Sequence, residues 1–300
     1  MEKPLVLAAL GMGQSAINPT RSMASGIQIS SSHARRKPIM KTLIKNLLYQ
    51  WPSLLANLMR MKSNWNRDKY VFLKIIEKGN IVLDVGGNIG DYCCTFAKVV
   101  GSSGQVHSFE PVPSTFDRLK STIVSEGLNN VILNEVAVSN ESGEIEVHMP
   151  GDDHARPSIQ KHTRESWDKN EPVHSFPCKC TTIDDYIQAN SIASVDFLKI
   201  DVEGAEHLVL QGAKRLLKNQ GPILFFEMWD SYMRDFGSTV KDFSELLNEA
   251  GYDRFLVIQE DLKPLQDLEQ NLNLHLDSGI LNLVCGKVAT HTRQFSAIKT

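Results

Sequence analysis

From residue 81 onward, short runs of apolar residues take turns with longer stretches in which apolar residues recur every three or four positions. A short apolar run is typical of a buried strand, and the wider spacing is typical of a helix with one buried face. The pattern predicts strands at residues 81–85, 105–109, 131–138, 144–149, 195–200, 223–226, 255–258 and 280–284. It predicts helices at residues 89–100, 114–126, 183–188, 205–217 and 240–250.

Strands that alternate with helices favour a parallel sheet covered by helices on both faces, with right-handed crossovers. We therefore expect an α/β fold with a doubly wound, mostly parallel sheet. In such a fold a ligand binds beyond the carboxyl ends of the strands, where the strand order reverses.

The N-terminal part of the chain has a different pattern. Residues 1–39 have no apolar periodicity, so we expect them to be disordered. Residues 40–78 predict a helical extension with an apolar stripe between Met40 and Met61. Pro52 should kink or split this stretch, and a second helix is predicted over residues 67–77. The stripe must cover something, either the following domain, a second subunit or a membrane surface, and we favour the domain.

Charge is distributed unevenly along the chain. Residues 1–62 contain nine Lys or Arg and one acid, Glu2, which leaves 23 basic and 34 acidic residues in the rest. A basic head can be a targeting segment, a membrane-surface helix, a nucleic-acid tail or a solvated extension, and we expect the last. The net charge of −3 gives no reason to expect nucleic-acid binding.

The compartment is suggested by weaker signals. No window of 18 or more uncharged apolar residues exists, so we expect no transmembrane helix. Residues 13–40 are Ser-rich and free of acids, as transit peptides are, but a cytoplasmic protein is our expectation. The five cysteines form no C-x-x-C pair, which argues against a zinc ribbon and fits buried thiols in a reduced compartment.

A glycine-rich loop follows the first apolar strand. Asp84 ends the strand, and Gly86, Asn88 and Gly90 follow at alternate positions before a helix begins. Glycines let the backbone turn sharply and approach a ligand, and a helix N-terminus offers unpaired N–H groups. The dinucleotide fingerprint needs glycines at i, i+2 and i+5, and Asn88 and Asp91 occupy the second and third of these positions, so that motif is absent.

Glu110 ends the second strand of the repeating pattern. A carboxylate there can accept hydrogen bonds from both hydroxyls of a ribose. The same arrangement serves nicotinamide enzymes, so Glu110 alone does not choose the cofactor.

Three stretches together resemble the FkbM-type methyltransferases, a branch of the class I S-adenosylmethionine enzymes. They are Val82 to Gly90 (VLDVGGNIG), Phe109 to Pro111 (FEP), and Thr182 to Tyr186 (TIDDY) followed by Phe197 to Glu206 (FLKIDVEGAE). The resemblance covers about residues 70–230. It departs from the family at Gly87, where Ala is common.

The resemblance implies a seven-stranded Rossmann-like methyltransferase sheet over residues 79–290, followed by a tail at 291–300. It also implies that S-adenosylmethionine is the cofactor. The residues expected to bind it are Asp84, Gly86, Gly87, Asn88, Gly90, Glu110, Pro111 and Ala137. The implied reaction is O-methylation of a hydroxyl on a sugar, macrolide or other small molecule.

Candidate catalytic residues lie at the ends of the next two strands. Methyl transfer to a hydroxyl requires an oriented acceptor and removal of its proton. Asp201 is the first candidate base, although an Asp at this point can also cap the next helix. Glu227 is the second candidate, and it is expected to pair with Lys199. Asp201, Glu227 and Asp230 could imitate a magnesium site, but we expect no metal.

Residues 150–177 form a polar insert between predicted elements. Long loops in compact domains are usually functional or disordered, so we expect this insert to recognise the acceptor, a small molecule, glycan or lipid-like compound. His154, Arg156, Ser158 and Trp167 offer it hydrogen-bonding and stacking groups, whereas His162 and His174 fit surface positions.

Two other functions remain open at this level. One is a nicotinamide-dependent oxidoreductase on a similar sheet, and the other is a non-catalytic protein that binds S-adenosylmethionine. The sequence does not indicate the oligomeric state.

Overall fold

The computed structural model describes residues 46–150, 158–159, 172–259, 261–265, 268 and 280–298. The chain divides into two compact units, residues 1–42 and 43–300, and all described residues belong to the second. The N-terminal segment predicted to be disordered and most of the polar insert therefore lie outside the described residues.

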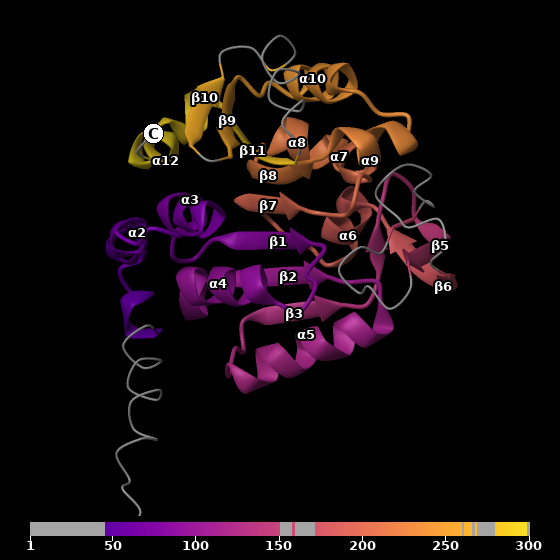
Figure 1. Ribbon diagram of the computed structural model, residues 1–300, viewed down its shortest axis with the longest axis horizontal. Coiled ribbons are helices and arrows are strands. Elements are labelled where there is room, and N and C mark those ends of the chain that lie inside the picture. The colour runs from indigo at the N-terminus through magenta and orange to yellow at the C-terminus, as the bar shows by residue number, and fades with distance from the viewer. Residues whose placement is uncertain are drawn as a thin grey trace, which may run out of the picture. The chain divides into compact units, whose positions relative to one another are not determined.

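An eight-stranded sheet forms the centre of the second unit (Figure 1), in the order β10-β9-β11-β8-β7-β1-β2-β3. Its strands are β1 (Ile81–Val85), β2 (Gln105–Phe109), β3 (Val131–Asn134), β7 (Phe197–Ile200), β8 (Ile223–Met228), β9 (Arg254–Ile258), β10 (Leu262–Leu265) and β11 (Leu281–Gly286). β3, β2, β1, β7 and β8 pair in parallel, and β11 runs antiparallel between β8 and β9. The predicted mostly parallel sheet is confirmed.

The sheet has one strand more than the expected seven. β10 pairs antiparallel with β9 at the edge of the sheet. Its sequence, Leu-Lys-Pro-Leu, is short and contains Pro264, which suits an edge strand and gives little strand signal.

Helices cover both faces of the sheet, which confirms the doubly wound arrangement. Alternate strand residues enter two separate apolar cores: Leu198 and Phe226 belong to one, and Phe197 and Phe225 to the other. The first core includes residues of α6 (Ile183–Ala189), α7 (Glu206–Gln211), α8 (Lys214–Asn219), α9 (Asp230–Asp235) and α10 (Val240–Glu249). The second includes residues of α2 (Pro52–Arg60), α3 (Arg67–Ile75), α4 (Asp91–Val100), α5 (Pro113–Ser125) and α12 (Val288–Ala297).

A small second sheet lies beside the carboxyl ends of the main strands (Figure 1), with the order β4-β6-β5. β4 (Ala137–Val138), β5 (Gly143–Pro150) and β6 (Val173–Thr181) form it. The strand predicted over residues 131–138 is therefore wrong as one element, because the chain leaves the main sheet after Asn134. The first part of β6, residues 173–177, falls in the segment that the polar pattern predicted to be irregular. The strand gave no clear signal because it is largely exposed and contains Pro177.

The helix predicted over residues 205–217 is two helices, α7 and α8. They separate at Gly212, where a Cβ atom would lie 2.2 Å from the carbonyl oxygen of Ser139. The Asp184 carboxylate then accepts hydrogen bonds from the backbone N–H groups of Arg215 (2.8 Å) and Leu216 (2.9 Å), which starts α8. At the end of the chain, α12 takes up most of the segment that was expected to be a tail.

The two N-terminal helices pack together. Pro52 splits the predicted segment, as expected: it stands at the first position of α2, where its missing N–H costs nothing. Leu55 and Ala56 of α2 are buried, whereas Leu54 and Leu58 are exposed. The apolar stripe therefore covers the domain with only part of its residues.

Candidate active site

The glycine-rich loop folds back on the neighbouring strands. The backbone N–H groups of Gly86 and Gly87 both donate to the carbonyl oxygen of Phe109, at 3.0 and 2.9 Å. Gly86 has a φ of +77°, and a Cβ atom there would lie 1.9 Å from the carbonyl oxygen of Asp201. This position requires glycine because the end of β7 passes so close. The close approach is to the protein's own backbone.

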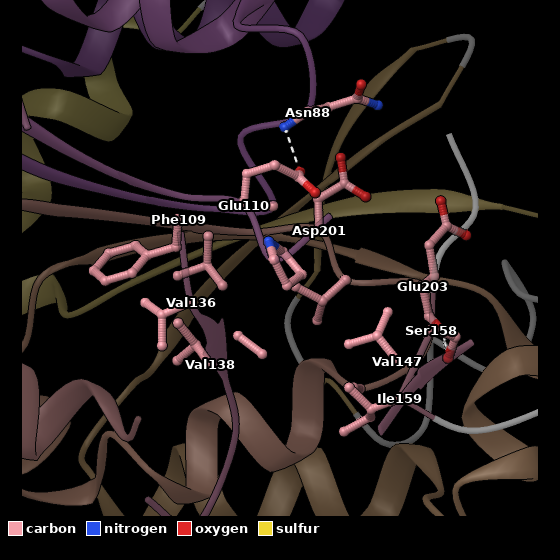
Figure 2. A pocket seen from close by; sticks show the side chains of 16 residues that line it. Asn88, Phe109, Glu110, Val136, Val138, Val147, Ser158, Ile159, Asp201 and Glu203 are labelled. Carbon is pink, nitrogen blue, oxygen red and sulfur yellow. Dashed lines mark hydrogen bonds between the residues drawn. The ribbon is translucent and has the colours of Figure 1, made fainter. Parts of the chain in front are cut away.

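Glu110 connects the loop to the start of α5. Its carboxylate accepts hydrogen bonds from the backbone N–H groups of Asn88 (2.9 Å, Figure 2) and Val112 (3.0 Å). Burial raises the Glu110 pKa to about 7, although the two N–H groups oppose this rise. The side chain is therefore held rigidly at the end of β2, where it also faces the pocket.

Lys199 is a buried cation behind the loop. Its ammonium group donates to the carbonyl oxygens of Val85 (3.2 Å) and Gly86 (2.5 Å), and lies 3.4 Å from Asp84 Oδ1 and 3.5 Å from Asp201 Oδ2. Burial alone would lower the Lys199 pKa, but the two carboxylates outweigh it and raise that pKa above its usual value. The expected Lys199–Glu227 pair is wrong, because Asp84 and Asp201 lie closer to the ammonium group.

Asp84 has no exposed surface. Ser108 donates to its Oδ2 atom at 2.9 Å, and Lys199 approaches the other oxygen. The carboxylate thus braces β1 against β2 and β7.

A pocket opens at the carboxyl ends of β1, β2 and β7. The expected site residues that line it are Gly86, Asn88, Glu110, Pro111, Ala137 and Asp201. Asp84, Gly87, Gly90 and Glu227 are not among its lining residues. A Cβ atom on Gly87 would lie 2.2 Å from Ser108 Oγ, so this glycine allows the loop to pack against β2.

Two apolar groups that the sequence did not suggest complete the pocket (Figure 2). Phe109, Val136 and Val138 lie together on one side of Glu110. Val147 of β5 and Ile159 lie on the other, beside Ser158. The short second sheet brings Val138 of β4 and Val147 of β5 to the pocket, whereas Phe109 comes from the end of β2. The pairing of the second sheet was not predicted.

Among the described residues that line the pocket, every charged side chain is acidic. Glu110, Asp201 and Glu203 contribute carboxylates, and no Lys or Arg is present among the described residues that line it. The nearest buried cation, Lys199, lies behind the loop and is engaged by backbone carbonyls. The pocket therefore suits a cationic ligand and opposes a phosphate.

The turn between β7 and α7 is held by Glu206. Its Oε1 atom accepts from the backbone N–H groups of Val202 (2.9 Å) and Gly204 (3.3 Å), and burial raises its pKa to about 7. The N-cap of α7 is Ala205, with no side-chain hydrogen bond. Asp201 is therefore not a helix cap. Its side chain is 34% exposed and turns toward the pocket mouth.

Glu227 lies at the end of β8, in register with Asn282 of β11. Burial raises the Glu227 pKa to about 8, and the charges of Asp201 and Glu206 add to that rise. Asp68 of α3 is close by: its carboxylate accepts from Tyr92 (2.7 Å) and Asn282 (3.1 Å). Asp68 and Asn282 are 214 residues apart, so no local motif could have revealed this cluster.

The metal alternative finds no support in this geometry. Asp230 pairs with Arg234 at 2.8 Å on the exposed side of α9. Among the described residues, no group of three or more His, Cys, Asp or Glu side chains is arranged to hold a metal ion.

The described part of the polar insert comprises residues 150, 158–159 and 172–177. Ser158 exchanges backbone hydrogen bonds with His148 of β5, at 2.7 and 2.8 Å, and lines the pocket. His174 lies on β6 and is exposed. His154, Arg156, His162 and Trp167 lie outside the described residues.

The same part of the chain matches a known domain. The Methyltransferase FkbM domain matches residues 84–254, more than half of the chain. This chain belongs to the FkbM methyltransferase family. The resemblance that the loop and the strand ends suggested is thereby confirmed.

Three characterised relatives show how far the FkbM similarity extends. The chain is 27% identical over 180 residues to the hexuronic acid methyltransferase AglP of Haloferax volcanii, covering 60% of this chain and 66% of that protein. It is 29% identical over 161 residues to the 31-O-demethyl-FK506 methyltransferase FkbM of Streptomyces tacrolimicus, covering 46% and 61%. It is 28% identical over 154 residues to the 2-O-methyltransferase NoeI of Sinorhizobium fredii, covering 48% and 62%. The chain spans about two thirds of the length of these relatives or slightly less.

Among solved structures, that of methyltransferase FkbM from Methylobacillus flagellatus is similar with a TM-score of 0.44 and 13% identity. The similarity covers 81% of this chain and 60% of that one.

The FkbM match includes every described residue that lines the pocket, from Val85 to Ala205, and it also includes Glu227. It begins after α2 and α3 and ends before β11. Asp68 and Asn282, which lie near Glu227, are thus outside the family region. Within the described residues, no helix is both long and apolar enough to cross a membrane.

Proposed function

We propose that this protein is an S-adenosylmethionine-dependent methyltransferase that methylates a hydroxyl group on a sugar or another small molecule. The observation that carries the proposal is the FkbM-region pocket, which presents three carboxylates and no basic side chain among its described lining residues. S-Adenosylmethionine is a sulfonium with an ammonium group, so a negative pocket favours it.

The residues present fit this cofactor. Glu110 has two carboxylate oxygens that can accept from the ribose hydroxyls in addition to the backbone N–H groups it already binds. The apolar wall formed by Phe109, Val136 and Val138 suits the adenine ring. Gly86, Asn88, Pro111 and Ala137 complete the surface that would hold the molecule. When bound, the cofactor supplies an electrophilic methyl group.

Asp84, Gly87 and Gly90 have a different role in this proposal. They line no part of the pocket and instead fix the loop against its neighbours. We therefore assign them to shaping the cofactor site, without direct contact.

Asp201 is the residue proposed to receive the proton of the acceptor hydroxyl. It lies at the pocket mouth, is partly exposed and does not cap α7. When the acceptor oxygen takes the methyl group, the S–CH3 bond of the sulfonium would break and S-adenosylhomocysteine would leave, while the hydroxyl proton would pass to the carboxylate of Asp201. Glu227 is the alternative base, because its pKa of about 8 matches a proton acceptor that works near neutral pH.

The acceptor classes follow from the names of the relatives. AglP acts on a hexuronic acid, NoeI is a 2-O-methyltransferase, and FkbM methylates 31-O-demethyl-FK506. We propose a glycan or small-molecule hydroxyl of this kind, and the carboxylate-rich pocket mouth favours polyhydroxylated acceptors, which donate hydrogen bonds to it.

A nicotinamide-dependent oxidoreductase fits the pocket less well. A dinucleotide brings a pyrophosphate, and the described lining residues offer it no cation. Isothermal titration with S-adenosylmethionine, S-adenosylhomocysteine, NADH and NADPH separates the two functions. Binding of the first two alone supports the proposal, and binding of NADH alone would overturn it.

Catalysis is tested separately from binding. The full chain would be incubated with methyl-labelled S-adenosylmethionine and, in turn, a hexuronic acid glycan, neutral sugars and a macrolide. Label transferred to an acceptor supports an enzyme, and the position of the label identifies the hydroxyl. Tight cofactor binding without transfer to any acceptor, in this panel or in cell extract, would indicate a non-catalytic binding protein.

A further inference from the structure

One face of α2 and the turn before it is apolar and exposed. The exposed fractions are 59% for Leu47, 56% for Trp51, 49% for Leu54, 43% for Leu58 and 82% for Met61. Leu54 and Leu58 lie one helical turn apart on α2, Trp51 and Met61 flank the helix at its two caps, and Leu47 precedes it; the five exposed residues are here named the α2 stripe. Leu55 and Ala56, on the other side of the helix, already pack against the body of the protein.

The α2 stripe is larger than folding requires. Single exposed apolar residues are ordinary on soluble proteins, but a contiguous exposed strip marks an interaction surface. Its position supports a separate role. α2 lies beside the amino ends of the parallel strands, at the opposite end of the sheet from β5 and the pocket (Figure 1).

The segment of chain that carries the stripe has charges of one sign only. Residues 3–67 contain ten Lys or Arg and no Asp or Glu. Within the described part, Arg60 precedes Met61 and Lys62 follows it, and Arg60 and Arg67 lie over the ring of Trp65 at 5.8 and 5.1 Å. Any partner that covers the stripe must therefore be compatible with the positive charge of this segment.

We propose that the α2 stripe docks this protein on the surface of an anionic lipid bilayer. A helix with an apolar face and a basic surrounding lies in the plane of the membrane interface, with its apolar side chains among the acyl chains. Basic residues close to the helix are attracted to anionic headgroups, and Trp51 suits the interface because its ring is apolar and its N–H is polar. This inference does not depend on the proposed methyltransferase activity.

Other occupants fit the stripe less well. In a symmetric dimer the two stripes would meet, which would bring two acid-free basic segments together. Residues 3–45 of the same chain are a second alternative occupant. They are also basic and free of acids, so they would add positive charge to a segment that is already positive. A nucleic acid could neutralise the charge, but it has no surface for the aliphatic side chains of Leu47, Leu54 and Leu58.

Sedimentation with lipid vesicles tests the proposal on the full chain. We expect at least roughly tenfold stronger binding to vesicles of phosphatidylcholine with phosphatidylserine than to phosphatidylcholine alone, with the difference reduced by salt. The variant Leu54→Ser/Leu58→Ser should lose this binding by at least roughly tenfold, because it removes two apolar side chains from the interface. Val124→Ser, at a 73% exposed position on α5, is the matched control and should bind as the natural protein does.

A charge variant separates the two contributions. Lys62→Glu should weaken binding to the anionic vesicles, whereas Lys120→Glu on α5, the control, should have a smaller effect. All variants change exposed residues, and thermal unfolding checks that each one folds.

Four results would overturn the proposal. The first is absence of binding to anionic vesicles. The second is equal binding by the Leu54→Ser/Leu58→Ser variant. The third is a stable dimer in light scattering that the double variant dissociates while vesicle binding is absent, which would assign the stripe to a second copy of the chain. Tight binding of a labelled oligonucleotide in place of vesicles would likewise assign the basic segment to nucleic acid.

Discussion

Glu110 joins two parts of the molecule with one carboxylate. It fixes Asn88 and Val112 through their N–H groups and still presents oxygen to the pocket. Because its charge is partly desolvated, small changes at this residue should affect ligand binding more than they affect the fold.

We predict that Glu110→Gln weakens S-adenosylmethionine binding by at least roughly tenfold, since a hydrogen bond to a charged group contributes about 1.5 kcal/mol or more. The amide keeps an oxygen for one of the two backbone N–H groups but turns its NH2 toward the other, so the melting temperature should fall modestly. Titration calorimetry measures the dissociation constant. An unaltered constant would remove Glu110 from the ribose site.

The two candidate bases can be separated by their response to pH. We predict that Asp201→Asn lowers the turnover number by at least roughly tenfold while cofactor affinity stays within a few fold, because the amide cannot accept a proton. In this protein Asp201 caps no helix, so the substitution leaves α7 intact.

If Glu227 is the base, the turnover of the natural protein should rise through pH of about 8, the region of its pKa. The variant Glu227→Gln should then lose both the rise and most of the activity. Full activity in Glu227→Gln together with the loss in Asp201→Asn would assign the proton to Asp201.

At the scale of elements, the end of β7 and the loop after β1 are in direct contact. Gly86 lies against the carbonyl of Asp201, and Lys199 binds the carbonyls of Val85 and Gly86 from behind. The same contacts among Gly86, Lys199 and the backbone of Asp201 therefore position both the glycine-rich loop and the first candidate base.

We predict that Gly86→Ala destabilises the protein by about 2 kcal/mol more than Gly127→Ala, because overpacking against fixed atoms costs about 1–3 kcal/mol. Gly127 is the matched control: its φ is +65°, near the +77° of Gly86, but a Cβ atom there meets nothing within 4 Å. Both variants lose the freedom of glycine at positive φ, and only Gly86→Ala adds a collision. Urea unfolding measures the difference, and equal destabilisation would show that the contact yields easily.

Sequence patterns located the helices and strands well where one hydrophobic period continued along the whole element. The strands and helices from β1 to α5 follow the predicted order, because each has a buried face that repeats regularly. The patterns failed where a tertiary contact decided the outcome. Residues 131–138 form two strands in two sheets, and α7 ends at Gly212, where the carbonyl of Ser139 leaves no room for a side chain.

The candidate site was also predictable only in part. Gly86, Asn88, Glu110 and Asp201 could be found because each follows a strand that was itself predictable. The partners of Lys199 could not, since a strand pattern places a side chain on a face but does not choose between neighbouring carboxylates.

At the scale of the whole molecule, several buried carboxyl groups act on stability together. Burial raises the pKa of Glu110 and Glu206 to about 7 and that of Glu227 to about 8. These three groups therefore bind more protons in the folded protein than in the unfolded chain between about pH 5 and pH 8. By linkage, their contribution to the free energy of unfolding falls as the pH rises through this range, whereas His107, His207 and His291, whose pKa burial lowers, contribute in the opposite direction near pH 6.

We predict that the natural protein unfolds at a lower temperature at pH 9 than at pH 6 for this reason. Glu227→Gln should reduce the difference, because its amide has no charge to bury at high pH, and Glu144→Gln, at an exposed position on β5, is the control. Scanning calorimetry across the pH range measures the effect. A stability that rises steadily from pH 6 to pH 9 would contradict the burial of these charges.

The placement of α2 and the pocket at opposite ends of the strands has an evolutionary consequence. A strand of five residues is roughly 17 Å long, so substitutions at one end do not reach the other. The FkbM match begins only at residue 84, after α2 has ended. If α2 docks the protein on a membrane and the pocket methylates an acceptor, as proposed, selection can alter the location through α2 and the acceptor through the strand ends separately.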